Sequence, residues 1–90
     1  MNTPSTYAVY LKRRAERELR NLPQNIRTRV DVRLAALANN PRPPGVVKLS
    51  GETDSHWRIR VGEYRILYQI DDQHHLIEIY RIKHRRYAYR

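Results

Sequence analysis

The sequence predicts a single α+β domain in which a helical hairpin packs on one face of a small antiparallel sheet. Apolar residues recur every three or four positions in the first half of the chain, which is typical of helices. In the second half they recur at every second position, which is typical of strands. A length of 90 residues is that of one small domain. We therefore expect one domain over residues 1–90 with the element order β-α-α-β-β-β.

The first half contains a short strand and two helices. The run from Tyr7 to Leu11 is apolar but too brief for a helix, so it predicts the first strand. The apolar stripe of the first helix consists of Leu11, Ala15, Leu19 and Leu22. Pro23 ends this helix and presets φ for the first turn of the next. The stripe of the second helix consists of Ile26, Val30, Leu34 and Leu37, and Asn-Asn-Pro at 39–41 ends it. Two helices joined this tightly form an antiparallel hairpin.

The second half predicts an antiparallel meander of three strands. Trp57, Ile59 and Val61 fall on one face of the first of these strands, and Arg58 and Arg60 fall on the other. Short turns at residues 62–63 and 71–74 separate it from strands at residues 64–70 and 76–82. The apolar face of the meander needs a cover, and the helical hairpin is the only element available. The opposite face then carries the arginines.

Positive charge dominates the composition. Lys and Arg number 18 against 9 Asp and Glu, which leaves a formal net charge of +9. Of the 18 cations 15 are arginine, the side chain that pairs bidentately with phosphate and stacks on bases. Nucleic acid is therefore the first partner that the composition indicates. For any single arginine on a helix, the alternative is a solvated face.

Several classes of function are excluded. The chain has no cysteine, so it can form neither disulfides nor thiolate zinc sites. Its 3 glycines, Gly45, Gly51 and Gly62, fit neither a P-loop nor a dinucleotide fingerprint. His74 and His75 are adjacent in an expected turn and do not have the spacing of a helical zinc site. No apolar run has the length of a membrane span or a signal segment. We expect a cytoplasmic protein with no cofactor, no metal and no membrane partner.

Four segments in register carry a resemblance to a known family. They are Leu-Pro at 22–23, Lys-Leu-Ser-Gly at 48–51, Trp-Arg-Ile-Arg-Val-Gly-Glu-Tyr-Arg-Ile-Leu-Tyr at 57–68, and His-Arg-Arg at 84–86 followed by Tyr-Arg at 89–90. Together they resemble the RelE/ParE superfamily of type II toxins, on its RelE side. The resemblance implies a microbial-RNase-like fold and a metal-independent endoribonuclease that cleaves mRNA in the ribosomal decoding site. It also implies a cognate antitoxin that wraps the toxin and represses their shared operon, so that operator DNA is bound only through the antitoxin. The net charge predicts that this antitoxin is acidic.

Cleaving RNA without metal means that the 2′-hydroxyl attacks the adjacent phosphate while cations neutralise its oxygens. The resemblance assigns this neutralisation to Arg65 and Arg85, and it matches Tyr89 to the tyrosine that stacks on or aligns the substrate. Arg58 and Arg60 fall where the best-known branch of the family has lysines. Because a guanidinium keeps its proton, we expect these two to bind phosphate and not to act as a base. The expected RNA-binding set is Lys48, Arg58, Arg60 and Arg86.

The group that accepts the proton is open. His84 is the only imidazole placed among these cations, and an unperturbed histidine titrates at about 6.5. His84 is therefore a candidate for the base, Tyr89 is the other group in that region able to move a proton, and water is the remaining alternative. Arg65 and Arg85 have a structural alternative as ion-pair partners of Glu63 or Glu78.

Two other functions fit the same fold. Gyrase-directed members of the superfamily inhibit DNA gyrase and hydrolyse nothing, and a catalytically inert RNA-binding module would share the charge. The ending from His84 to Arg90 favours the RNase, because gyrase-directed members generally lack it.

Overall fold

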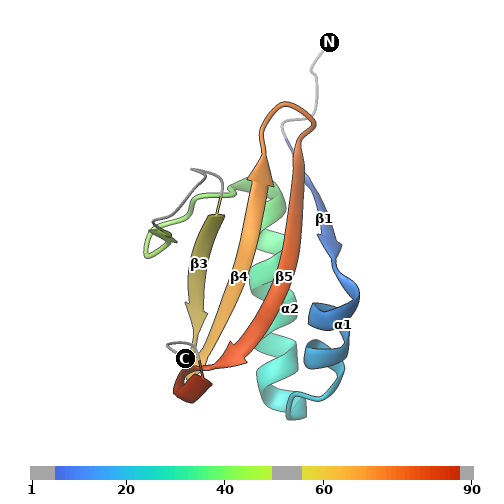
Figure 1. Cartoon of the computed structure of the whole chain (residues 1–90), viewed down its shortest axis with the longest axis vertical. Coiled ribbons are helices and arrows are strands. Elements are labelled where there is room, and N and C mark those ends of the chain that lie inside the picture. The colour runs from blue at the N-terminus through green and yellow to red at the C-terminus, as the bar shows by residue number, and fades with distance from the viewer. Residues whose placement is uncertain (1–5, 50–55, 88–90) are drawn as a thin grey trace.

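The computed structural model describes residues 6–49 and 56–87, and it has two helices packed on one face of a five-stranded sheet (Figure 1). In chain order the elements are β1 (Ala8–Leu11), α1 (Arg13–Arg20), α2 (Gln24–Asn39), β2 (Val47–Lys48), β3 (His56–Val61), β4 (Tyr64–Asp71), β5 (Leu76–His84) and the 3₁₀ turn η1 (Arg85–Tyr87). Figure 1 looks onto the uncovered face of the sheet, with both helices behind it. The predicted α+β class and helical layer are confirmed.

The sheet is mixed, and the predicted antiparallel arrangement holds for every pair of strands except β1 and β5. The strand order is β1-β5-β4-β3-β2. β1 runs parallel to β5, with Ala8 opposite Leu76 and Leu11 opposite Ile79, whereas every other pair is antiparallel. Parallel pairing needs a long crossover, and the two helices between β1 and the meander provide it. The two-residue strand β2 was not predicted, because it is too short for a period of two to be visible.

The helices bury the stripes that the sequence indicated, with one correction. In α2, Val30, Leu34 and Leu37 are buried as expected. The helix α1 is only 8 residues long, so Leu11 belongs to β1 and Leu22 follows the helix. The eight buried residues on the helix-facing side of the sheet are Ile59, Val61, Ile66, Tyr68, Ile70, Ile77, Ile79 and Ile82.

A β-bulge in β5 changes which side chains face the helices. Leu67 of β4 lies opposite Arg81, but the next residue, Tyr68, lies opposite Ile79, so Tyr80 is an extra residue in β5. A bulge of this kind reverses the alternation beyond it. Ile82 consequently points into the core, and Lys83 points to the uncovered face.

One carboxylate protects the part of β5 that extends beyond β1. Glu18 of α1 accepts a hydrogen bond from the backbone N–H of Ile82 at 2.7 Å and another from Nε of Arg81 at 3.0 Å. An unpaired strand edge is a site for unwanted pairing with other chains. Glu18 therefore occupies an edge that β1 is too short to cover.

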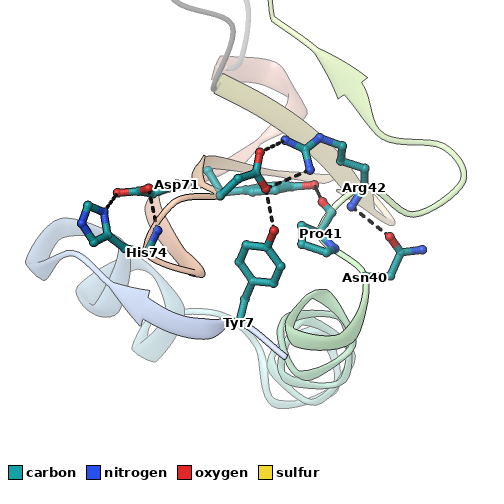
Figure 2. Close-up of polar contacts among 8 residues, drawn as sticks. Tyr7, Asn40, Pro41, Arg42, Asp71 and His74 are labelled. Carbon is teal, nitrogen blue, oxygen red and sulfur yellow. Dashed lines mark hydrogen bonds and ion pairs between the residues drawn. The ribbon is translucent and has the colours of Figure 1, made fainter. Parts of the chain in front are cut away.

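A polar cluster ties the N-terminal segment, the loop after α2 and the β4–β5 turn together (Figure 2). Asp72 accepts a hydrogen bond from the hydroxyl of Tyr7 at 2.5 Å and a bidentate pair from Arg42, the shorter contact being 2.8 Å. Arg42 and then Tyr7 hold the pKa of Asp72 below its usual range. Tyr68 donates to the backbone oxygen of Pro41 at 2.7 Å, and burial raises the pKa of Tyr68 to about 12. The β4–β5 turn, which carries Asp72, lies at the end of the sheet opposite to η1 (Figure 1).

Candidate functional site

A row of three cations crosses the uncovered face of the sheet. Arg60 of β3 lies opposite Arg65 of β4, and Arg65 lies opposite Lys83 of β5. Adjacent strands are about 4.8 Å apart, and like charges directly opposite each other destabilise a sheet. We call these three residues the cationic row. A fold does not gain stability from such a row, so its presence indicates a negatively charged ligand.

Arg65, in the middle of the cationic row, is buried and has nitrogens without hydrogen-bond partners. It is 5% exposed, and it is the one buried charged side chain among the residues that the structure describes. Its Nε and NH1 atoms are buried without a hydrogen-bond partner. Two buried N–H donors without partners destabilise a fold, because each has lost its water and gained no hydrogen bond in return. Neither of the structural partners expected for Arg65, Glu63 and Glu78, forms an ion pair with it within the described ranges.

Arg85 lies beside the row, at the β3–β4 turn. Its backbone N–H donates to the backbone carbonyl oxygen of Glu63 at 2.6 Å. Its NH1 atom is 3.3 Å from the side-chain carboxylate of Glu63. Gly62 makes this tight turn possible with a φ of +57°. Both side chains of the ion pair are more than half exposed, so an arriving phosphate can displace the carboxylate. The structural alternative for Arg85 is thus present, and it leaves the guanidinium accessible.

The other residues that were predicted to bind RNA lie on both faces of the sheet and in η1. By the register, Arg58 points to the uncovered face, whereas Lys48 lies opposite Trp57 and shares its helix-facing side. Arg86 is exposed in η1. Lys48 is therefore not brought to the cationic row.

His84 is turned away from the row. It lies opposite Tyr64, and the two rings meet edge to face with centroids 5.1 Å apart. Tyr64 packs against the core, so both rings lie on the helix-facing side, and Nδ1 of His84 accepts from the backbone N–H of Arg86 at 3.2 Å. The predicted juxtaposition of His84 with Arg65 is absent because of the bulge in β5. Tyr89 lies outside the described residues.

Sequence reasoning missed an aromatic pair on the uncovered face. His56, expected to be a turn residue, begins β3, and its Nδ1 is 3.1 Å from the hydroxyl of Tyr80. Both rings are half-buried. The alternation of β3 would have placed His56 on the face of Arg58 and Arg60, but the strand was expected to start one residue later.

Comparison with known proteins decides the family. The model of the ParE toxin of type II toxin-antitoxin system, parDE, matches residues 9–89. Toxin RelE of Mycobacterium tuberculosis is 35% identical over 91 aligned positions, which cover 100% of this chain and 93% of that protein. The chain belongs to the RelE/ParE superfamily of type II toxins.

Solved structures place the toxin within the RelE family. It matches the archaeal RelE–RelB complex from Pyrococcus horikoshii with a TM-score of 0.81 and 30% identity, covering 92% of this chain and 99% of that one. It matches the RelBE2 toxin–antitoxin complex from Mycobacterium tuberculosis with a TM-score of 0.77 and 32% identity, covering 88% and 98%. In both, the relative was solved together with its antitoxin.

The RelE-family toxin also has a basic groove between α2 and the β3–β4 turn, and Arg60 of the cationic row is part of its lining. The groove has a volume of about 350 Å³, and its lining also includes Arg29, Arg33 and Val32. Val32 is 64% exposed, so it can offer an apolar contact to a partner. The groove combines an apolar anchor point with positive charge.

Neither a metal centre nor a membrane helix is found in the described part of the toxin. No three His, Asp or Glu side chains within residues 6–49 and 56–87 converge on a point that could hold a metal ion. No helix in these ranges is long and apolar enough to cross a membrane.

Proposed function

We propose that this RelE-family toxin is a ribosome-dependent endoribonuclease that cleaves mRNA by attack of a 2′-hydroxyl on the adjacent phosphate, which forms a 2′,3′-cyclic phosphate and releases the 5′-oxygen of the next nucleotide as a hydroxyl. The observation that carries the proposal is Arg65, a buried guanidinium without a partner in the middle of a row of cations. A phosphodiester supplies the missing negative charge, and the transition state of its cleavage carries more charge than the ground state. A fixed, desolvated guanidinium stabilises that additional charge strongly, since it needs no reorganisation during the reaction.

The cations have distinct tasks in this mechanism. Arg65 binds the non-bridging oxygens of the scissile phosphate, with Arg60 and Lys83 on either side of it. Arg85 exchanges its exposed contact with Glu63 for the substrate and neutralises charge from the direction of the turn. Arg58 and Arg86 hold the phosphates of neighbouring nucleotides, which positions the strand without reading its sequence.

Proton transfer requires a group other than an arginine, because a guanidinium cannot accept a proton. We propose Tyr89, whose ring or hydroxyl the family resemblance brings to the substrate. His84 would have to leave its contact with Tyr64 before it could act as a base.

Three variants distinguish these roles of Tyr89 and His84. If Tyr89 only stacks, Tyr89→Phe is nearly silent and Tyr89→Ala costs on the order of 1 to 3 kcal/mol in single-turnover cleavage. If Tyr89→Phe is as damaging as Tyr89→Ala, the hydroxyl moves the proton. If His84 is the base, His84→Gln loses single-turnover cleavage while it still binds RNA.

The proposed partners follow from charge. A toxin of net charge +9 needs an acidic antitoxin, which we place over the helical hairpin and the basic face of the sheet. The groove with Val32 supports this placement, because an amphipathic acidic segment finds there both an apolar contact and the three arginines Arg29, Arg33 and Arg60. Operator DNA is bound through the antitoxin. We propose that toxin, ribosome and mRNA meet in the cytoplasm.

Inhibition of DNA gyrase is the second candidate, and the match to the ParE toxin model favours it. One experiment separates the two functions. Purified toxin is added to ribosomes programmed with a labelled mRNA, and in parallel to gyrase with relaxed plasmid. The proposal expects cleavage of ribosome-bound mRNA, little cleavage of free mRNA and normal supercoiling. Blocked supercoiling with intact mRNA would replace the proposal with the gyrase function.

A further inference from the structure

The uncovered face of the sheet carries an aromatic patch next to the cationic row. His56 of β3 and Tyr80 of β5 reach toward each other across β4, with ring centroids 5.4 Å apart and ring planes inclined at 60°. The contact between Nδ1 and the hydroxyl at 3.1 Å fixes both rings. Leu67 of β4 lies on the same face opposite Arg58 and is half-buried. We call His56, Leu67 and Tyr80 the aromatic patch.

The bulge of β5 is what creates this patch. Tyr80 is the extra residue of the bulge, so it has no register partner in β4 and its ring leans over the strand toward His56. Bulges are over-represented next to functional sites, where they redirect a side chain. The same bulge brings Lys83 to the uncovered face, so one irregularity in the chain produces both the patch and one end of the row.

The half-buried rings of the aromatic patch and the cations beside it together indicate a single strand of RNA as the ligand. Half-buried rings on the open face of a sheet are the surface on which RNA-binding sheets stack unpaired bases. A stacked base requires that its phosphates be held nearby, and on β3 the order along one face is His56, Arg58, Arg60. The spacing between His56 and Arg60 is about 13 Å at a rise of roughly 3.3 Å per residue. A single RNA strand can therefore place one phosphate on the row and the base of a nearby nucleotide on the patch.

We propose that the aromatic patch is a base-binding subsite that stacks the base of one mRNA nucleotide near the scissile phosphate but not directly next to it. The inference rests on the proposed endoribonuclease function. It adds the residues that hold a base, whereas the cationic row holds only phosphate. Cleavage should consequently depend on the presence of a base at one position of the mRNA besides those that flank the cut.

The test combines variants of the toxin with abasic nucleotides in the mRNA. Single-turnover cleavage is measured on ribosomes programmed with unmodified mRNA and with mRNAs that lack one base at successive positions around the cut. For the wild-type toxin we expect one position at which removing the base slows cleavage about 5- to 150-fold, the effect of one stacked base. Tyr80→Ala should slow cleavage of unmodified mRNA by a similar factor, and removing the base at that position should then have little further effect.

Controls separate this inference from the folding of the toxin and from the proposed function. Tyr80→Phe keeps the ring and should retain most of the rate, and Tyr10→Ala removes an exposed tyrosine of the neighbouring strand β1 and should leave the base dependence intact. If Tyr80→Ala does not fold, His56→Ala takes its place. The subsite would be overturned if the folded Tyr80→Ala or His56→Ala variant showed the same base dependence as the wild type. It would also be overturned if Tyr10→Ala lost the base dependence to the same extent. Failure of the wild type to cleave unmodified mRNA would overturn the proposed function instead.

Discussion

Replacing Arg65 by methionine should make the toxin more stable and much less active. Arg65→Met keeps a long, flexible side chain and removes a charge that is 5% exposed and has two unpaired nitrogens. Each buried polar group without a partner costs about 1 to 3 kcal/mol, and exchanging buried ionic groups for apolar ones of similar volume can stabilise a protein by roughly 1 to 4 kcal/mol. We expect the free energy of unfolding to rise by about 1 to 3 kcal/mol.

Thermal and denaturant unfolding measure this gain. For a domain of 90 residues, 1 kcal/mol corresponds to a shift in Tm of about 4 to 8 °C. Arg58→Met is the matched control, because Arg58 lies on the same face but is only half-buried, so its replacement should change Tm little. Cleavage by Arg65→Met should fall by about 10² to 10³, the loss for one preorganised donor to a developing negative charge.

An anionic ligand should reduce the difference in the free energy of unfolding between Arg65→Met and the wild type. A ligand at 100 times its Kd stabilises the folded state by about 2.7 kcal/mol, so a short RNA oligonucleotide should raise Tm of the wild type more than that of Arg65→Met. Destabilisation by Arg65→Met of more than about 1 kcal/mol would refute the reasoning. It would mean that the guanidinium stabilises the free toxin, and the argument for an anion site at Arg65 would then have no basis.

Other parts of the molecule give further predictions. Arg85→Ala should lower single-turnover cleavage by about 10² to 10³ while far-UV circular dichroism and Tm stay near those of the wild type, since the side chain is exposed; full cleavage by the folded variant would remove Arg85 from the site. Val32→Asp should weaken binding of the acidic antitoxin roughly tenfold in titration calorimetry, and unaltered affinity would exclude the groove as its contact. Asp72→Asn should destabilise the toxin at neutral pH. Because the folded pKa of Asp72 is lowered, its contribution is complete above about pH 3.9 and is lost as the pH falls through the folded value, so the unfolding curves of variant and wild type should converge there. If the difference in stability between Asp72→Asn and the wild type persisted at low pH, the charge of the Asp72 carboxylate would not be the cause of that difference.

The sequence predicts the parts of the fold that repeat with a regular period. The stripe of α2 and the alternation of β4 are long enough for the period to be unambiguous, and both describe the core correctly. The parallel pairing of β1 with β5 has no such signal, because it depends on how the helical hairpin crosses the sheet. A strand of two residues, β2, is too short to have a period at all.

The sequence predicts the face of the sheet on which a side chain lies where the alternation of apolar and polar residues is regular. It does not do so beyond the β-bulge. Arg58, Arg60 and Arg65 lie on β3 and β4, whose pairing is regular, and the period of two places them on the uncovered face. His84 follows the bulge in β5, so it lies on the helix-facing side, away from the cations among which it was expected. The burial of Arg65 could not be predicted either, because alternation assigns a residue to a face but does not say what else covers that face.

The pairing of β1 with β5 also determines when the sheet can be completed. These strands are the first and the last in the described part of the chain, and Ala8 lies opposite Leu76, so their contacts close a long loop, and such non-local pairings form slowly. A chain grows from its N-terminus at about 5 to 20 residues per second, so β1 is made several seconds before the strand with which it pairs. While β5 is still missing, the growing chain has neither a complete sheet nor a complete cationic row. The topology therefore delays the assembly of the cationic row until β5 has been made.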